Sequence, residues 1–165
     1  MKTKLIAVAV SAVVLSSCAD MTKMYPQTSA EFKTAPKIQK LTYTVPRSLD
    51  AVVASLEKGR KCVSDESVET RMGGGGMVST SRDLRYMTLE RTSRGRAELT
   101  LRLAMSNGLM QPKGGYFQLV GDFESQGPSA TKVTLHHGGP DELINALKEW
   151  SRGKDQSCHG YNGKA

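Results

Sequence analysis

Histidine and cysteine side chains near the end of the chain are the first residues whose types suggest chemistry. His136, His137, His159 and Cys158 carry the nitrogen and sulfur donors that a zinc ion prefers. Their spacing argues against a shared ion, because adjacent residues on a β-strand point to opposite faces and His136 and His137 therefore diverge. His137 has the register of the apolar residues on its predicted strand, so we expect it to be covered. The sequence therefore predicts neither a metal site nor another cofactor.

Patterns for nucleophilic or acid–base catalysis are weak. The chain has many serines but no Gly-x-Ser-x-Gly nucleophile pattern. Asp122 and Glu124 alternate on one predicted strand, yet no histidine is tied to them in the way a catalytic triad requires. Two carboxylates so placed are typical of a solvated sheet face. We therefore expect no enzyme activity.

Basic side chains are concentrated in one predicted hairpin. Six arginines lie within 21 residues, while the acidic residues among them are Asp83, Glu90 and Glu98. The guanidinium group binds phosphate and carboxylate in a bidentate manner, so this segment is a candidate surface for an anionic glycolipid or an acidic envelope protein. The alternative is a solvated sheet face with local ion pairs. The arginines of the candidate surface are Arg85, Arg91, Arg94, Arg96 and Arg102.

The first residues of the chain have the features of an export signal. Lys2 and Lys4 provide a positive start, and residues 5–15 are apolar apart from Ser11. At a rise of about 1.5 Å per residue, such a helix covers about half of the hydrocarbon core of a bilayer and is too short to span it. Residues 1–17 are therefore predicted to be a signal peptide that is removed on export.

The end of the apolar stretch reads Leu15-Ser16-Ser17-Cys18, an aliphatic residue and two small residues before a cysteine. This order resembles the lipobox of bacterial lipoproteins. The resemblance implies that a diacylglyceryl group is attached to the Cys18 sulfur, that a peptidase cuts before this residue, and that the new amine is acylated, commonly with palmitate. Two or three acyl chains anchor a protein firmly, whereas one holds it only marginally. The alternative is an ordinary signal peptide with a chance cysteine.

The residues around Cys18 bear on which membrane holds the protein. In the lipoprotein class an aspartate directly after the cysteine is a retention signal, but Ala19 occupies that place and Asp20 follows it. The resemblance therefore implies the outer membrane, with the domain facing the periplasm and surface display left open. Removal of Lys2 and Lys4 lowers the net charge from +7 to +5. An exported basic chain meets lipid headgroups and lipopolysaccharide phosphates, so we expect a membrane or envelope partner and no nucleic acid.

Two cysteines, Cys62 and Cys158, remain once Cys18 is assigned to lipid. An exported compartment is oxidising, so the lipoprotein interpretation implies a disulfide between them. Each lies just beyond a predicted helix, and both helices should pack on the same sheet face. Closing so long a loop stabilises a fold by up to about 4.7 kcal/mol in the chain-entropy model. A redox or metal pair is the competing interpretation, but the chain has no Cys-x-x-Cys motif.

Periodicity divides the mature chain into a tether and one domain. Residues 18–37 contain Pro26 and Pro36 and no regular apolar pattern, which predicts a lipidated N-terminus and a flexible tether that holds the domain about 20 to 25 Å from the membrane. Residues 38–165 are expected to form a single domain. The glycines at 73–76 predict a mobile connector, because the Gly-Lys-Ser/Thr that a phosphate-binding loop needs is missing after them.

Alternating and helical patterns predict the elements of the domain. Strands are expected at residues 40–45, 83–91, 96–105, 115–123 and 131–137. Helices are expected from Ser48 to about Lys61 and from Pro140 to Gly153, each with one apolar face. Both need the apolar face of the sheet, so the sequence predicts an α+β fold with about five antiparallel strands and two amphipathic helices packed on one face. The order is similar to a reduced helix-grip fold, a likeness of topology without a motif.

These features lead to three competing functions. The first is a non-catalytic accessory lipoprotein that contacts envelope proteins or polymers. The second is a binding module for an apolar or amphipathic ligand between sheet and helices, which needs an unfilled cavity lined by Leu99, Leu101, Leu103 and Trp150. The third is an envelope hydrolase, which needs convergent polar groups in a cleft. We favour the first and keep the second as the alternative.

Overall fold

The computed structural model describes residues 25–63, 67–72, 79–105, 111–112, 114–138 and 141–154. The predicted signal peptide, Cys18, the glycines at 73–76, Cys158 and His159 lie outside these residues. Within the described part of the chain, no helix has the length and apolar character needed to cross a bilayer. The described residues cover most of the expected domain together with the last part of the expected tether.

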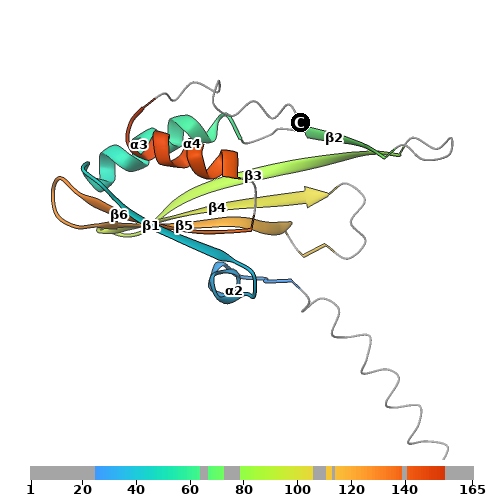
Figure 1. The fold of residues 1–165 in the computed structure, drawn as a ribbon, viewed down its shortest axis with the longest axis horizontal. Coiled ribbons are helices and arrows are strands. Elements are labelled where there is room, and N and C mark those ends of the chain that lie inside the picture. The colour runs from blue at the N-terminus through green and yellow to red at the C-terminus, as the bar shows by residue number, and fades with distance from the viewer. Residues whose placement is uncertain are drawn as a thin grey trace, which may run out of the picture.

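The described residues form an antiparallel sheet of six strands (Figure 1). The strands are β1 (Gln39–Val45), β2 (Ser67–Met72), β3 (Ser79–Ser93), β4 (Arg96–Met105), β5 (Tyr116–Ser125) and β6 (Thr131–His137). Their order in the sheet is β1-β6-β5-β4-β3-β2, so the chain meanders from β2 to β6 and β6 then pairs with β1. Five strands correspond to the predicted ones, and β2 is an additional strand paired with the start of β3. The predicted α+β fold is confirmed.

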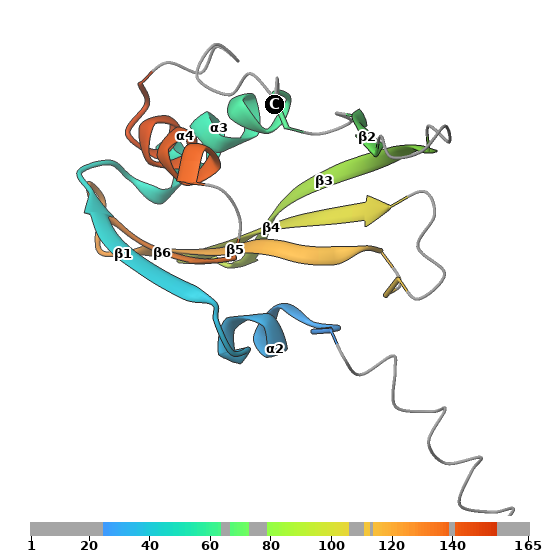
Figure 2. The ribbon, with the colours of Figure 1, turned by 45° about the vertical axis from the view of Figure 1, so that its right-hand side comes forward.

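Two amphipathic helices, α3 (Leu49–Arg60) and α4 (Asp141–Ser151), lie side by side over one face of the sheet (Figure 2). Ser48 caps α3, because its hydroxyl accepts a hydrogen bond from the Ala51 N–H at 3.3 Å. Asp50 lies in the first turn, where a negative charge is favourable. Both helices occupy the positions that the apolar periodicity predicts.

Side chains from both helices and from five strands fill the space between the layers with one continuous core. Leu99 and Leu101 are fully buried, and Trp150 is 2% exposed. At the contact between the helices, a Cβ atom on Gly59 would lie 2.4 Å from the ring of Trp150. Only glycine allows the helices to approach so closely, so α3 and α4 are fitted to each other as well as to the sheet.

The opposite face of the sheet carries the short helix α2 (Ser29–Thr34) (Figure 2). Thr28 and Glu31 form a capping box, in which each side chain accepts a hydrogen bond from the other residue's backbone N–H, at 3.2 Å and 3.3 Å. Phe32 is 4% exposed and packs on the sheet. The flexible tether predicted for residues 18–37 is therefore wrong for its last part, because a capped helix with a buried aromatic ring orders it.

Candidate functional site

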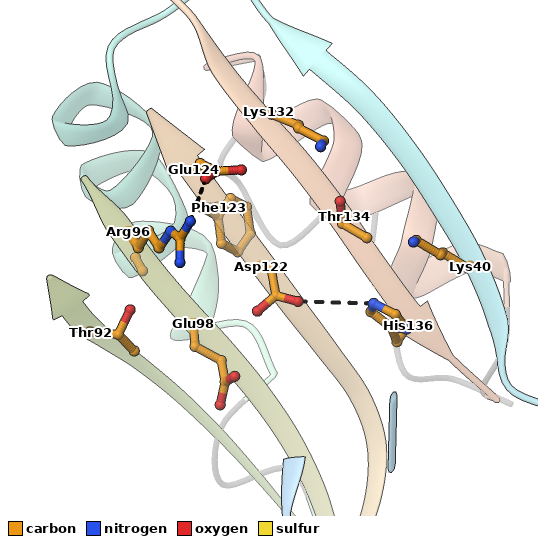
Figure 3. A pocket seen from close by; sticks show the side chains of 11 residues that line it. Lys40, Thr92, Arg96, Glu98, Asp122, Phe123, Glu124, Lys132, Thr134 and His136 are labelled. Atoms are coloured by element: carbon orange, nitrogen blue, oxygen red, sulfur yellow. Dashed lines mark hydrogen bonds and ion pairs between the residues drawn. The ribbon is translucent and has the colours of Figure 1, made fainter. Parts of the chain in front are cut away.

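A pocket of about 370 Å³, here called the polar pocket, lies on the face of the sheet that carries α2 (Figure 3). Charged side chains from β1, β4, β5 and β6 stand on this side of the sheet, while α3 and α4 lie behind it. The residues that line the pocket are Lys40, Thr92, Arg96, Ala97, Glu98, Asp122, Phe123, Glu124, Lys132, Thr134 and His136. Basic and acidic side chains thus lie together on one concave surface.

Lys33 reaches from α2 to two carboxylates of the polar pocket. Its Nζ atom lies 2.8 Å from Glu98 Oε2 and 2.6 Å from Asp122 Oδ1. Glu98 and Asp122 are direct cross-strand neighbours, so one cation offsets the repulsion of two like charges. Burial acts to lower the pKa of Lys33, but the hydrogen bonds to Asp122 and Glu98 outweigh it and the pKa is raised. Lys33 therefore links α2 to the sheet through two ion pairs.

Phe32, the neighbour of Lys33, gives α2 an apolar attachment to β5. Its ring packs on Phe117 with the centroids 5.7 Å apart, and Val120 completes a small cluster that is separate from the main core. Phe32 and Lys33 thus hold the helix by two different kinds of contact. The end of the expected tether is fixed beside the polar pocket.

His136 lies at the side of the polar pocket beside Asp122. Its Nε2 atom is 3.9 Å from Asp122 Oδ2, and the residue is 9% exposed. Burial is the largest cause that lowers the pKa of His136, and the charges of Lys33 and Lys40 act in the same direction. Together they outweigh the attraction of Asp122 and the hydrogen bond to the backbone of Lys33. The surroundings therefore favour the neutral form of the imidazole.

The two adjacent histidines are both buried, although the sequence predicts this only for His137. His137 is 6% exposed and lies on the side of α4, which confirms the expectation. The cover over His136 comes from α2, about a hundred residues earlier in the chain. No pattern within β6 signals such a distant contact.

The outer part of the polar pocket contains paired and unpaired charges. Arg96 Nη2 lies 2.8 Å from Glu124 Oε1, so all three pocket carboxylates have a cationic partner. Asp122 and Glu124, predicted to form a solvated face, are 41% and 39% exposed and are also paired. Lys40 and Lys132 are exposed and belong to no ion pair within the described residues. The pocket therefore presents free positive charge to an anionic group.

The structure divides the predicted arginine surface between the two faces of the sheet. Arg91 forms an ion pair with a carboxylate of α3 on the helix-covered face, and Arg85 follows the same alternation on β3. Arg96 and Arg102 lie on the α2 face, where Arg102 stacks over a phenylalanine ring of β5 at 4.2 Å. Arg94 lies in the turn between β3 and β4. The predicted arginines therefore do not share one face of the sheet, and binding of an anionic partner by any of them stays a prediction.

Two further kinds of site, a metal centre and a Ser-x-x-Lys nucleophile, find little support among the described residues. In these ranges no group of three or more His, Cys, Asp or Glu side chains is placed to hold a metal ion. The spacing Ser-x-x-Lys, found in one class of serine nucleophile, occurs at Ser55, Ser129 and Ser151. However, Ser55 accepts a hydrogen bond from Arg47 at 2.9 Å, and Ser151 donates one to the Lys148 carbonyl at 2.8 Å. Both hydroxyls serve the packing of the helices.

The cysteines are only partly covered by the described residues. Cys62 follows α3 and packs, half-buried, against the main core. Cys158 and Cys18 lie outside the described residues. The Cys62–Cys158 disulfide and the lipid on Cys18 therefore remain predictions.

Comparison with known proteins gives a distant structural likeness. No family model and no curated protein matches the chain. Among solved structures, a conserved protein from Geobacillus kaustophilus is similar with a TM-score of 0.35 and 10% sequence identity, over 69% of this chain and 91% of its own. A likeness at that level carries no argument about fold or function.

Proposed function

We propose that this protein is a non-catalytic lipoprotein of the outer membrane, anchored by lipid on Cys18, whose α+β domain contacts an envelope partner on the periplasmic side. The observation that carries the proposal is the lipobox-like sequence Leu15-Ser16-Ser17-Cys18 at the end of a short apolar stretch with a basic start. The domain begins only a few residues later.

The attachment of α2 to the sheet supports a role for the anchor in positioning the domain. The capping box fixes the start of the helix, Phe32 buries an aromatic ring, and Lys33 pairs with two carboxylates. A segment that served only as a spacer would need none of these contacts. We infer that the anchor holds the domain at a set place rather than on a loose chain.

The filled interior favours recognition at the surface over storage of an apolar ligand. The expected ligand cavity between sheet and helices would be lined by Leu99, Leu101, Leu103 and Trp150. Three of these side chains belong to the buried core cluster, and Leu103 is half-buried. The polar pocket on the α2 face offers exposed lysines instead. An acidic envelope protein or an anionic glycolipid is the kind of partner that fits this chemistry.

The experiment that tests the proposal is substitution of Cys18 in the full-length chain, expressed in a bacterium that processes lipoproteins. Cys18→Ser should abolish incorporation of labelled palmitate and should move the protein from the membrane to the soluble fraction. The double variant Cys62→Ser with Cys158→Ser is the control, because it removes two other cysteines and leaves the lipobox intact. Membrane association and palmitate labelling that persist in Cys18→Ser would contradict the proposal.

A further inference from the structure

The segment between the expected anchor and the domain is short and ends on one particular face of the sheet. Six residues, 19–24, separate Cys18 from Tyr25, where the described chain begins. Tyr25 packs edge-to-face on Tyr116 of β5, with the ring centroids 4.6 Å apart, and α2 follows at once on the same side of the sheet (Figure 2). A flexible chain of this length spans about 15 Å, and about 25 Å when fully extended.

This length favours one face of the domain as the one that meets the membrane. The helices α3 and α4 cover the face opposite α2 (Figure 1). To bring their outer surface onto the membrane, the segment would have to pass both the sheet and the helix layer, a path of about 20 Å. That path exceeds the relaxed span of about 15 Å and would need the segment to be nearly fully extended, whereas the α2 face meets the membrane with the segment relaxed.

Exposed aromatic and apolar side chains on the α2 face suit a membrane interface. Tyr25 is 40% exposed, and Tyr86 is 42% exposed in a second hollow that it shares with Arg102. Leu84, at 36% exposed, alternates with Tyr86 and so lies on the same face. Tyrosine side chains are favoured where a lipid bilayer meets water, because one end of the ring is apolar and the other polar.

Exposed lysines on the same side provide positive charge. Lys40 and Lys132 line the polar pocket from β1 and β6 (Figure 3). Lys37 lies in the turn between α2 and β1. The nearby carboxylates are bound by Lys33 and Arg96, so these three lysines are not neutralised by them. Each basic residue held near an anionic membrane surface contributes attraction to headgroup phosphates.

We propose that the α2 face of the sheet lies on the lipid surface, with Lys40 and Lys132 against headgroup phosphates and the tyrosines at the interface. The inference rests on the proposed function, because the lipid on Cys18 supplies the tether. It makes the anionic lipid headgroup the partner that the polar pocket meets. The domain is thus oriented by its own surface as well as held by its anchor.

The test measures which lysines the membrane covers. The full-length lipidated protein is reconstituted into vesicles of phosphatidylethanolamine and phosphatidylglycerol and treated with a water-soluble acetylating reagent, and each lysine is quantified by mass spectrometry. Lys37, Lys40 and Lys132 should each be labelled about fivefold less than in Cys18→Ser mixed with the same vesicles. This is the factor that about 1 kcal/mol per basic residue gives. Lys58 on α3 and Lys154 after α4 should be labelled equally in both.

A charge-reversal pair tests whether the face itself binds lipid. In Lys40→Glu with Lys132→Glu, the protection of Lys37 should be largely lost, whereas Lys58→Glu with Lys154→Glu makes the same change in charge and should leave it intact. Equal labelling of all lysines in protein that floats with the vesicles would overturn the inference and leave the anchoring in place. Protection of Lys58 and Lys154 instead would also overturn it. Protein that does not float with the vesicles would overturn the proposed function itself.

Discussion

The two faces of the sheet differ in the side chains that they carry. On one face α3 and α4 bury a continuous apolar core, in which several side chains have no exposed surface. On the other face the six-residue helix α2 leaves a charged pocket open beside it. The difference indicates that the helix-covered face supplies stability, while the α2 face is free to carry charges that meet a partner.

The largest expected effect lies on the helix-covered face. Gly59→Ala would place a Cβ atom 2.4 Å from the ring of Trp150, which is buried and has no space to move. We expect the free energy of unfolding in urea to fall by about 1 to 3 kcal/mol, the usual range for overpacking a core. Gly95→Ala is the matched control, because the nearest atom to its Cβ is at 4.0 Å. Equal stability of the two variants would show that the helices do not meet as described.

A smaller and more local effect is expected on the α2 face. Phe32→Ala removes the buried ring of α2. The free energy needed to detach α2 from the sheet should therefore fall by up to about 3 kcal/mol, the low end of the range for truncating a buried phenylalanine to alanine. Hydrogen exchange at the amides of α2 should become faster, while the amides of β4 and β5 keep their protection. Loss of protection throughout the sheet would contradict the separation of the two faces.

The smallest expected effect is a dependence on pH from His136. Its pKa is lowered in the folded state, mainly by burial, so the unfolded state binds more protons below the ordinary value of about 6.5. The stability that neutral His136 contributes is therefore present above that value and is lost as the pH falls toward the folded pKa. His136→Gln should reduce this loss in urea titrations at a series of pH values. A difference in the free energy of unfolding between variant and wild type that stays the same at every pH would refute the proposed role of His136.

The sequence predicts the helix-covered face well because its signals are local. Alternation gives five of the strands, and Ser48 marks the start of α3 as a cap. The short helix α2 is missed because it has only one apolar anchor, Phe32, and too few residues for a helical period. Its available signal is the capping-box spacing of Thr28 and Glu31.

The polar pocket could not be predicted because its contacts join distant parts of the chain. Lys33 pairs with residues 65 and 89 positions away, and its helix covers His136. The arginines show the converse, because a cluster in sequence separates in space: Arg91 and Arg96 flank one turn but bond on opposite faces of the sheet. The spacing of residues within one strand predicts which face of the sheet they lie on. The density of charged residues along the chain does not predict this.

The central claim, a lipid anchor on Cys18, is tested most directly by the mass of the N-terminal peptide of the protein purified from bacterial membranes. The account predicts a chain that starts at Cys18 and carries the added mass of a diacylglyceryl group, with or without an amide-linked acyl chain. An N-terminal peptide that begins elsewhere, or one that begins at Cys18 without lipid, would contradict it.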